Sequence, residues 1–130
     1  AVKAAMPSQA NSASHVPTCL LEAARGALGC DEAVEEFNAD YEKRREIMKK
    51  GLSDLPGIRV VEPEGAFYIF ADITGTGMSD TEFADGALEA GVQLIPASLI
   101  TGGEGFIRVS YATDEESIHE GLRRLKSWLI

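Results

Sequence analysis

The stretch "GFIRVSYATDEES", residues 105–117, decides the fold because a strand-forming run leads directly into an acidic helix start. Side chains alternate across a β-strand, so Arg108 shares one face with Phe106 and Ser110. The opposite face carries the side chains of Ile107, Val109 and Tyr111. These residue types favour β-structure, and that face is plainly apolar. The stretch therefore predicts a strand that buries one face and presents Arg108 on the other.

Arg108 has two interpretations from this stretch alone. It is either an ordinary arginine on the solvated face of a strand or a cation directed at a bound anion. The planar guanidinium matches a carboxylate through two hydrogen bonds, which makes arginine the usual residue for that task. The strand pattern leaves both interpretations open.

The composition is that of one globular domain. The chain has 130 residues, of which 45% are hydrophobic and 25% charged. Its formal net charge of −9 argues against a nucleic-acid partner, because phosphates require a basic surface. No apolar run approaches the ~20 residues of a membrane span, and residues 1–15 lack the apolar core of a signal peptide. We therefore expect a cytoplasmic protein with no membrane partner, whose chain begins inside a longer protein because Ala1 is not a methionine.

Few side chains are suited to catalysis or metal binding. Cys19 and Cys30 are too few for a disulfide framework, and we expect both thiols to be free and buried. His15 and His119 belong to no cluster with metal-ligand spacing, so we expect solvated or structural roles for them and no metal site. A Schiff-base lysine needs apolar surroundings that lower its pKa, and no lysine of the sequence has them. The lysines are Lys3, Lys43, Lys49, Lys50 and Lys126.

Hydrophobic periodicity and turn residues predict one α+β domain over residues 16–130, after an extended lead-in over residues 1–15. The predicted helices cover residues 17–28, 31–51, 78–90 and 113–130. The predicted strands cover residues 58–61, 66–70, 92–97 and 106–112, with a loop over 98–105. The first two strands are expected to pair closely or form a hairpin. The order α-α-β-β-α-β-β-α predicts two layers, in which helices cover a small, mostly antiparallel sheet.

Cap residues predict where the helices begin and end. Ser79 or Asp80 is the expected N-cap of the third helix, and Thr113 or Asp114 that of the fourth. Gly51 is expected to end the second helix, although Leu52 could still pack underneath it, and Gly91 is expected to end the third. The apolar spacing predicts the inner faces of the last two helices, which are Phe83, Ala84, Ala87 and Leu88, and Ile118, Leu122, Leu125 and Leu129.

Three stretches, taken in order, resemble a known protein domain. They are "LPGIRVVEPEGAFYIFADI", "SDTEFADGALEAGVQLIPAS" and "GGEGFIRVSYATDEESIHEGLRRLKSWL". From residue 12 to the end, the chain resembles the C-terminal small domain of class I/II, fold-type-I aminotransferases, the pyridoxal-phosphate enzymes related to aspartate aminotransferase. The motifs P-x-G-A-F-Y and R-x-S-Y-A, followed by an acidic capped helix, make the resemblance specific.

The resemblance implies substrate-binding roles for two residues. In that family the arginine of the corresponding strand binds the substrate's α-carboxylate, and Arg108 occupies its position. A fixed cationic fork on a rigid strand can orient an amino acid for chemistry at Cα. Gly65 lies in the segment Glu64 to Tyr68, which resembles the part of the domain that closes near the substrate, and would let the backbone approach closely. The cofactor-binding residues of this chain stay unknown.

The resemblance also implies a larger parent protein. The family's catalytic lysine, the aspartate paired with the pyridine nitrogen and most phosphate ligands lie in a large domain outside this chain. We therefore expect pyridoxal 5'-phosphate in the full-length parent but not on this chain alone, and we predict that the isolated chain is inactive. The parent is expected to be a homodimer that transfers an amino group between an amino acid and a 2-oxo acid. Leu20, Leu21, Phe37 and Tyr41 are expected to pack partly against the missing large domain.

Two other functions stay open. The chain could be a stand-alone small-molecule-binding or regulatory α+β domain that uses Arg108 for a carboxylate effector, or a structural or dimerising module. The sequence does not name the amino-acid substrate. One departure bears on specificity, because residues 96–101 read "PASLIT" where the family commonly has "PGSAFG", near the substrate entrance in relatives.

Overall fold

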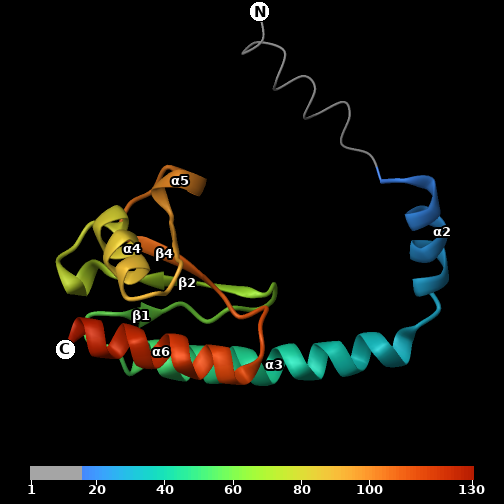
Figure 1. Ribbon diagram of the computed structural model, residues 1–130, viewed down its shortest axis with the longest axis horizontal. Coiled ribbons are helices and arrows are strands. Elements are labelled where there is room, and N and C mark those ends of the chain that lie inside the picture. The colour runs from blue at the N-terminus through green and yellow to red at the C-terminus, as the bar shows by residue number, and fades with distance from the viewer. Residues whose placement is uncertain (1–15) are drawn as a thin grey trace, which may run out of the picture. The chain divides into compact units, whose positions relative to one another are not determined.

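The computed structural model describes residues 16–130 and confirms the predicted order of elements (Figure 1). Two short helical segments, η1 and α5, are added to that order. The lead-in expected over residues 1–15 lies outside the described residues. The elements are α2 (Thr18–Ala27), α3 (Asp31–Ser53), β1 (Arg59–Val60), β2 (Tyr68–Asp72), η1 (Thr74–Thr76), α4 (Asp80–Glu89), β3 (Ile95–Pro96), α5 (Ser98–Thr101), β4 (Phe106–Ser110) and α6 (Glu115–Leu129).

The chain divides into two compact units, and the boundary lies within α3, between Glu36 and Phe37. In the first unit, α2 follows Pro17 and buries none of its residues. The expectation that Cys19 and Cys30 are buried is therefore wrong, because both thiols are exposed. The apolar spacing along α2 gives the helix an apolar side, but that side meets no core among the described residues of this unit.

The second unit contains a sheet of four antiparallel strands in the order β1-β2-β4-β3. The predicted pairing of the first two strands is confirmed, since β1 pairs with β2. β4 lies between β2 and β3, and Arg108 at its centre is aligned with Phe70 on one side and Ile95 on the other. The predicted alternation also holds, because Ile107 and Val109 are buried while Arg108 is only partly covered.

The C-terminal part of α3 and the helix α6 lie side by side along the buried face of the sheet, where Gly51 approaches Leu122 (Figure 1). Together with α4 they close one apolar core in the second unit. The fully buried members of this core include Leu52, Ile69, Ala71, Ile73, Phe83, Ala87 and Ile107. The core also contains Ile118 and Leu125 from α6, with Leu122 and Leu129 packed partly against it, as their spacing predicts.

The helix caps follow the sequence signals. Ser79 caps α4 by accepting a hydrogen bond from the backbone N–H of Glu82, whose carboxylate accepts one in return from the N–H of Ser79. Asp114 caps α6 by accepting from the N–H of Ser117. Gly91 follows the end of α4 with φ of 81°, a conformation that glycine adopts without strain.

Two expectations about the helices are wrong. Gly51 does not end α3, which continues to Ser53, while Leu52 is buried in the core as the alternative allowed. A Cβ at Gly51 would meet the methyl groups of Leu122, so this glycine permits the close approach of α6. Leu88 was expected on the inner face of α4 but is 59% exposed. The buried side of the helix is the one that carries Phe83, Ala84 and Ala87, and Leu88 lies outside it.

Gly57, in the turn after α3, and Gly75, in η1, let two segments that are distant in the sequence touch. Pro56 and Gly57 form the turn predicted after α3, closed by a hydrogen bond from the N–H of Ile58 to the carbonyl of Leu55. Gly57 has φ of 76°, and a Cβ there would lie 2.6 Å from the backbone carbon of Gly75 in η1. The absence of a side chain at Gly57 therefore lets the two backbones touch.

Asp72, the last residue of β2, links this strand to β1 and to η1. Its carboxylate accepts hydrogen bonds from the N–H and hydroxyl of Thr74 at 2.9 and 2.6 Å, and from the Arg59 guanidinium at 2.6 Å. These donors, with the Thr74 hydroxyl contributing most, lower the pKa of Asp72 from 3.8 to about 2. The buried carboxylate thus fixes β1 and η1 to the end of β2.

We predict that Gly57→Ala destabilises the protein much more than Gly77→Ala. Both glycines have φ of 76°, but the space around Gly77 is open while that around Gly57 is filled by backbone. The left-handed backbone should cost either variant about 1 kcal/mol, and the clash at Gly57 should add about 2 kcal/mol more. Urea denaturation of the two variants measures the difference, and equal losses would contradict the close contact.

We also predict that Asp72→Asn removes part of the acid sensitivity of the fold. The pKa of this carboxyl is lower in the folded protein than its ordinary value of 3.8, so its stabilisation is present above pH 3.8 and is lost as the pH falls towards 2. The variant should lose about 2 kcal/mol at pH 7 and fall less steeply in stability below pH 4. Denaturation from pH 7 to pH 2 tests this, with Asp85→Asn on the exposed side of α4 as the matched control.

Candidate functional site

The candidate site is the uncovered face of the sheet around Arg108. The Arg108 side chain is half-buried, and its guanidinium carbon lies 5.2 Å from the centre of the Tyr68 ring. Phe70, directly opposite on β2, and Phe106, two residues earlier on β4, carry partly covered rings on the same face. A cation over an aromatic ring is stabilised by the ring quadrupole, so Tyr68 holds the guanidinium without neutralising it.

Among residues 16–130, Arg108 is the one arginine with no acidic partner within salt-bridge distance. The other arginines, which are Arg25, Arg44, Arg45, Arg59, Arg123 and Arg124, each contact an aspartate or glutamate. Asp72 shares the face of the sheet with Arg108, but its two oxygens are occupied by Arg59 and Thr74. The planar fork of Arg108 is therefore available for an external carboxylate.

The segment Glu64 to Tyr68 reaches this face at its last residue. Tyr68 contacts Arg108, while Gly65 lies on the rim of a separate polar hollow of about 300 Å³, shared with Tyr41, Arg45 and Tyr111. A Cβ at Gly65 would meet nothing within 4 Å. The structure thus connects the two expected substrate-binding residues through one short segment but does not bring them into one hollow.

Tyr111, which the sequence pattern assigns only to the apolar face of β4, also contacts this segment. Its hydroxyl donates to the carbonyl of Ala66 at 2.8 Å, and its N–H donates to the carbonyl of Phe67 at 2.9 Å. A phenol is protonated at neutral pH and can donate, and burial raises the pKa of Tyr111 further above its ordinary value of 10. The sequence signal for this contact was only the position of the tyrosine at the end of a buried strand face.

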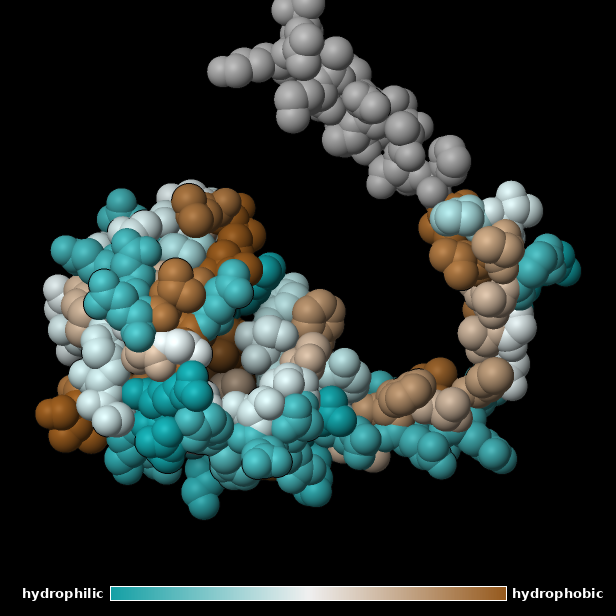
Figure 2. Space-filling model, in the orientation of Figure 1, coloured by the Kyte–Doolittle hydropathy of each residue, from teal (hydrophilic) through white to brown (hydrophobic). Residues whose placement is uncertain are grey.

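An apolar hollow of about 420 Å³ lies beside the same face, lined by Phe70, Ala97, Thr101, Gly103, Glu104 and Phe106. Residues 98–105 were expected to form a loop, but Ser98–Thr101 is the short helix α5. Its first N–H, from Ser98, donates to buried Asp80 at 2.8 Å, and this bond lowers the pKa of that carboxyl. Leu99 is 76% exposed, and Figure 2 shows apolar side chains gathered over α5.

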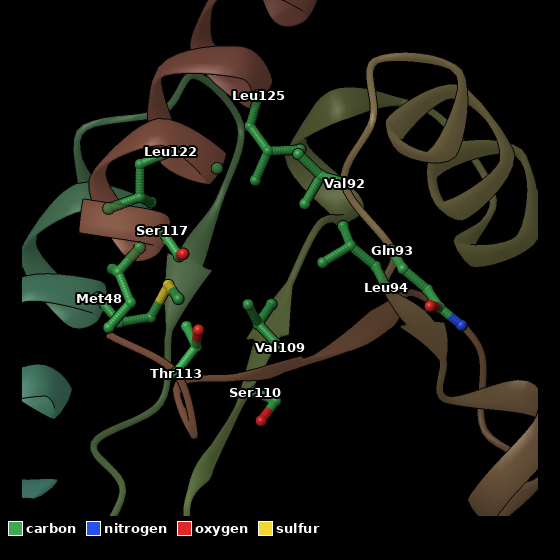
Figure 3. Close-up of a pocket in the computed structure, with 12 residues that line it drawn as sticks. Met48, Val92, Gln93, Leu94, Val109, Ser110, Thr113, Ser117, Leu122 and Leu125 are labelled. Carbon is green, nitrogen blue, oxygen red and sulfur yellow. The ribbon is translucent and has the colours of Figure 1, made fainter. Parts of the chain in front are cut away.

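A second apolar hollow, of about 100 Å³, lies on the other side of β4 (Figure 3). Met48 from α3, Leu122 and Leu125 from α6, and Val109 from β4 converge on it. Its lining contains no charged side chain, so it offers nothing that would bind an ionic substrate. It is a gap in the packing between α6 and the sheet, opposite the face that carries Arg108.

The described residues do not fit a pyridoxal phosphate site of their own. Glu115 raises the pKa of Lys43 through a hydrogen bond, and Glu46 and Glu62 raise that of Lys49. Both changes oppose the lowered pKa that a Schiff-base lysine requires. Lys50 and Lys126 are exposed, while Lys3 lies outside the described residues.

The rest of the described chain offers little other chemistry. Residues 16–130 contain no group of three histidine, cysteine, aspartate or glutamate side chains that could hold a metal ion. His119 is exposed on α6, and His15 lies outside the described residues. No helix in this part of the chain is both long enough and apolar enough to cross a membrane. Among residues 16–130, the guanidinium of Arg108 beside aromatic rings is the arrangement whose charge and geometry match a carboxylate.

Comparison with known proteins identifies the family. The family model "Aminotransferase class I and II" matches residues 2–125. The aspartate aminotransferase of Pyrococcus horikoshii is 44% identical over 121 residues, which cover 92% of this chain and 31% of that protein. The solved structure of the Rhizobium meliloti aspartate aminotransferase matches with a TM-score of 0.80 at 29% identity. The match covers 98% of this chain and 35% of the chain in that structure. The structure of the aromatic aminotransferase from P. horikoshii matches with a TM-score of 0.70 at 39% identity. The match covers 74% of this chain and 26% of the chain in that structure.

The matched region has a limited extent in every one of these relatives. The chain spans between about a quarter and about a third of their length. Within that share, the family model extends from the residues before α2 to the last turns of α6. The chain therefore belongs to the class I and II aminotransferases and corresponds to only part of the length of those enzymes.

Proposed function

We propose that this chain is the C-terminal, substrate-carboxylate-binding domain of a pyridoxal-phosphate-dependent aminotransferase, and that Arg108 binds the α-carboxylate of the substrate. The observation that carries the proposal is the unpaired fork of Arg108. Every other arginine among residues 16–130 contacts a carboxylate of the chain, while Arg108 lies half-buried beside aromatic rings with none. An unpaired, partly desolvated guanidinium gains free energy when a carboxylate binds it.

The surroundings of Arg108 supply orientation as well as charge. Arg108 is the middle residue of β4, held between Phe70 and Ile95 by hydrogen-bonded strands. The Tyr68 ring limits the positions that the guanidinium can take. A carboxylate held by both arms of the fork is fixed in distance and in plane, so the neighbouring Cα of the substrate is fixed too. In this proposal the domain binds and orients the amino acid or 2-oxo acid.

The amino-transfer chemistry would come from the cofactor and from residues outside this chain. When bound in the full-length enzyme, pyridoxal phosphate serves as the electron sink for bond breaking at Cα. The described lysines do not suit its attachment, so the isolated chain would have no activity. Gly65 remains a proposed substrate-binding residue, because it lies in the segment that leads into Tyr68.

Exposed apolar side chains support the proposal that a large domain or a second subunit covers this chain in a homodimeric parent. Leu20 and Leu21 on α2 are exposed, as is Phe37 on α3, which the sequence predicted for a surface facing another domain. Tyr41 does not share this exposure, because it packs against the core with its ring centre 6.2 Å from that of Tyr111. Leucine and phenylalanine on a helix surface favour burial against a partner.

We expect Arg108→Lys to lower kcat/KM of the full-length enzyme about a hundredfold for amino and 2-oxo acids alike, because lysine keeps the charge but loses the two-pronged contact. The corresponding loss is about 2–3 kcal/mol of transition-state binding. The matched control is Arg59→Lys, whose guanidinium is already occupied by Asp72. Steady-state kinetics measure both variants.

The same substitution should change the stability of the 130-residue chain by no more than about 0.5 kcal/mol, since Arg108 has no acidic partner in the described residues to leave unpaired. A strong destabilisation would indicate a structural role with an internal partner. An unchanged kcat/KM in the full-length enzyme would show that Arg108 does not bind substrate.

We also predict that the isolated chain forms no specific covalent adduct with pyridoxal phosphate. After incubation with the cofactor, borohydride reduction and peptide mapping should find sparse labelling spread over several surface lysines. The control is the same treatment in denaturant, which should give a similar distribution. Stoichiometric labelling of one lysine that depends on the native fold would contradict both this prediction and the assignment of the attachment lysine to a region outside this chain.

A further inference from the structure

Tyr111 connects the end of β4 to the segment that precedes β2. Its side chain is 1% exposed, and its hydroxyl donates to the carbonyl of Ala66 at 2.8 Å. The backbone N–H of the same residue donates to the carbonyl of Phe67 at 2.9 Å, and the hydroxyl of Ser110 reaches that carbonyl at 3.4 Å. The adjacent residues Ser110 and Tyr111, at the end of the strand that carries Arg108, therefore bind the consecutive carbonyl groups of Ala66 and Phe67.

Ala66 has a backbone conformation that needs this support. Its φ is 65°, and it is the one non-glycine with positive φ among the residues that the structure describes. Alanine in the left-handed region is strained, because its Cβ crowds the following carbonyl. Such strain persists only where surrounding contacts impose it, and it gathers at functional sites. The Tyr111 hydroxyl donates to the carbonyl of Ala66 itself and is therefore a contact that can hold this strained conformation.

Ala66 is followed directly by Phe67 and Tyr68, whose rings contact each other. The ring centres of Phe67 and Tyr68 are 5.4 Å apart in an edge-to-face arrangement, and those of Tyr68 and Phe70 are 6.1 Å apart. Tyr68 in turn lies 5.2 Å from the guanidinium of Arg108. The contacts thus form a series from the Tyr111 hydroxyl, through Ala66 and Tyr68, to the guanidinium.

We propose that Tyr111 is a positioning residue of the carboxylate site, which holds the Ala66–Tyr68 segment in its strained conformation so that the Tyr68 ring fixes the Arg108 fork. This rests on the proposed function of Arg108. Tyr111 touches no substrate in this proposal and acts only through the segment. A purely structural Tyr111 would instead stabilise the core without any effect on the orientation of Arg108.

The substitution Tyr111→Phe removes the hydroxyl but keeps the ring that packs against Tyr41. A first test uses NMR of the 130-residue chain, in which the Arg108 side-chain protons should show an upfield ring-current shift from Tyr68. Arg108→Lys identifies those signals by their loss. Tyr111→Phe should reduce the upfield shift by at least about half, because the Tyr68 ring is no longer held in place.

A rescue variant separates positioning from packing. Ala66→Gly removes the strain at φ of 65°, so the segment no longer depends on the hydroxyl to keep its conformation. The double variant Tyr111→Phe/Ala66→Gly should restore the ring-current shift of Arg108, while Ala66→Gly alone should leave it unchanged. If Tyr111→Phe fails to fold, Ala66→Val at this exposed position perturbs the same conformation without touching the core, and should reduce the shift in the same way.

A second test uses the full-length enzyme with aspartate and phenylalanine as amino donors, since both carry the α-carboxylate. Tyr111→Phe should raise KM for both about fivefold with kcat within about twofold of wild type, and Ala66→Gly should reverse the rise. Unchanged Arg108 signals and KM in Tyr111→Phe, with lowered stability alone, would overturn the proposal. If the Arg108 signals respond but Arg108→Lys leaves kcat/KM unchanged, the positioning stands and the proposed function of Arg108 fails.

Discussion

The antiparallel pairing of β2 with β4 is the constraint on which the rest of the structure depends. Its register aligns Ile69 with Val109 and Ala71 with Ile107, so both strands turn their apolar side chains toward the helices. A shift of one residue would exchange the two faces and place Arg108 in the core. A buried guanidinium without a partner is costly, so hydrophobic burial on one face also determines where the cation lies on the other.

The distribution of charge explains why Arg108 stays available. Acidic residues outnumber basic ones in this chain, yet the two buried carboxylates, those of Asp72 and Asp80, already have donors of their own. Asp72 is bound by Arg59 and Thr74, and Asp80 accepts from the N–H of Ser98 at the start of α5. The same bonds that fix β1, η1 and α5 therefore keep these carboxylates away from Arg108. The guanidinium of Arg108 instead lies over the face of the Tyr68 ring, which supports a cation without competing with a carboxylate ligand.

Sequence reasoning failed where a residue's environment depends on distant segments. Gly51 carries a helix-ending signal, but α6 approaches so closely that Leu122 occupies the space a side chain would need, and α3 continues past it. Cys19 lies among apolar residues on α2, yet no core of its own unit covers them. The site shows the same limit, because Tyr111 and Ala66 are 45 residues apart and their hydrogen bond leaves no local pattern.

The sequence by itself determined the order of the elements, the buried face of β4 and the solvent-side position of Arg108. These follow from alternation, helical spacing and cap residues such as Ser79 and Asp114, whose effects act within a few residues of the chain. Only the tertiary structure decided that Arg108 lacks an acidic partner among the described residues and rests on Tyr68. It also decided that Ala66 is held in a left-handed conformation by Tyr111. The physical reason is that partner choice and backbone strain depend on which segments meet in space, and strand register and helix packing set those meetings only once the chain has folded.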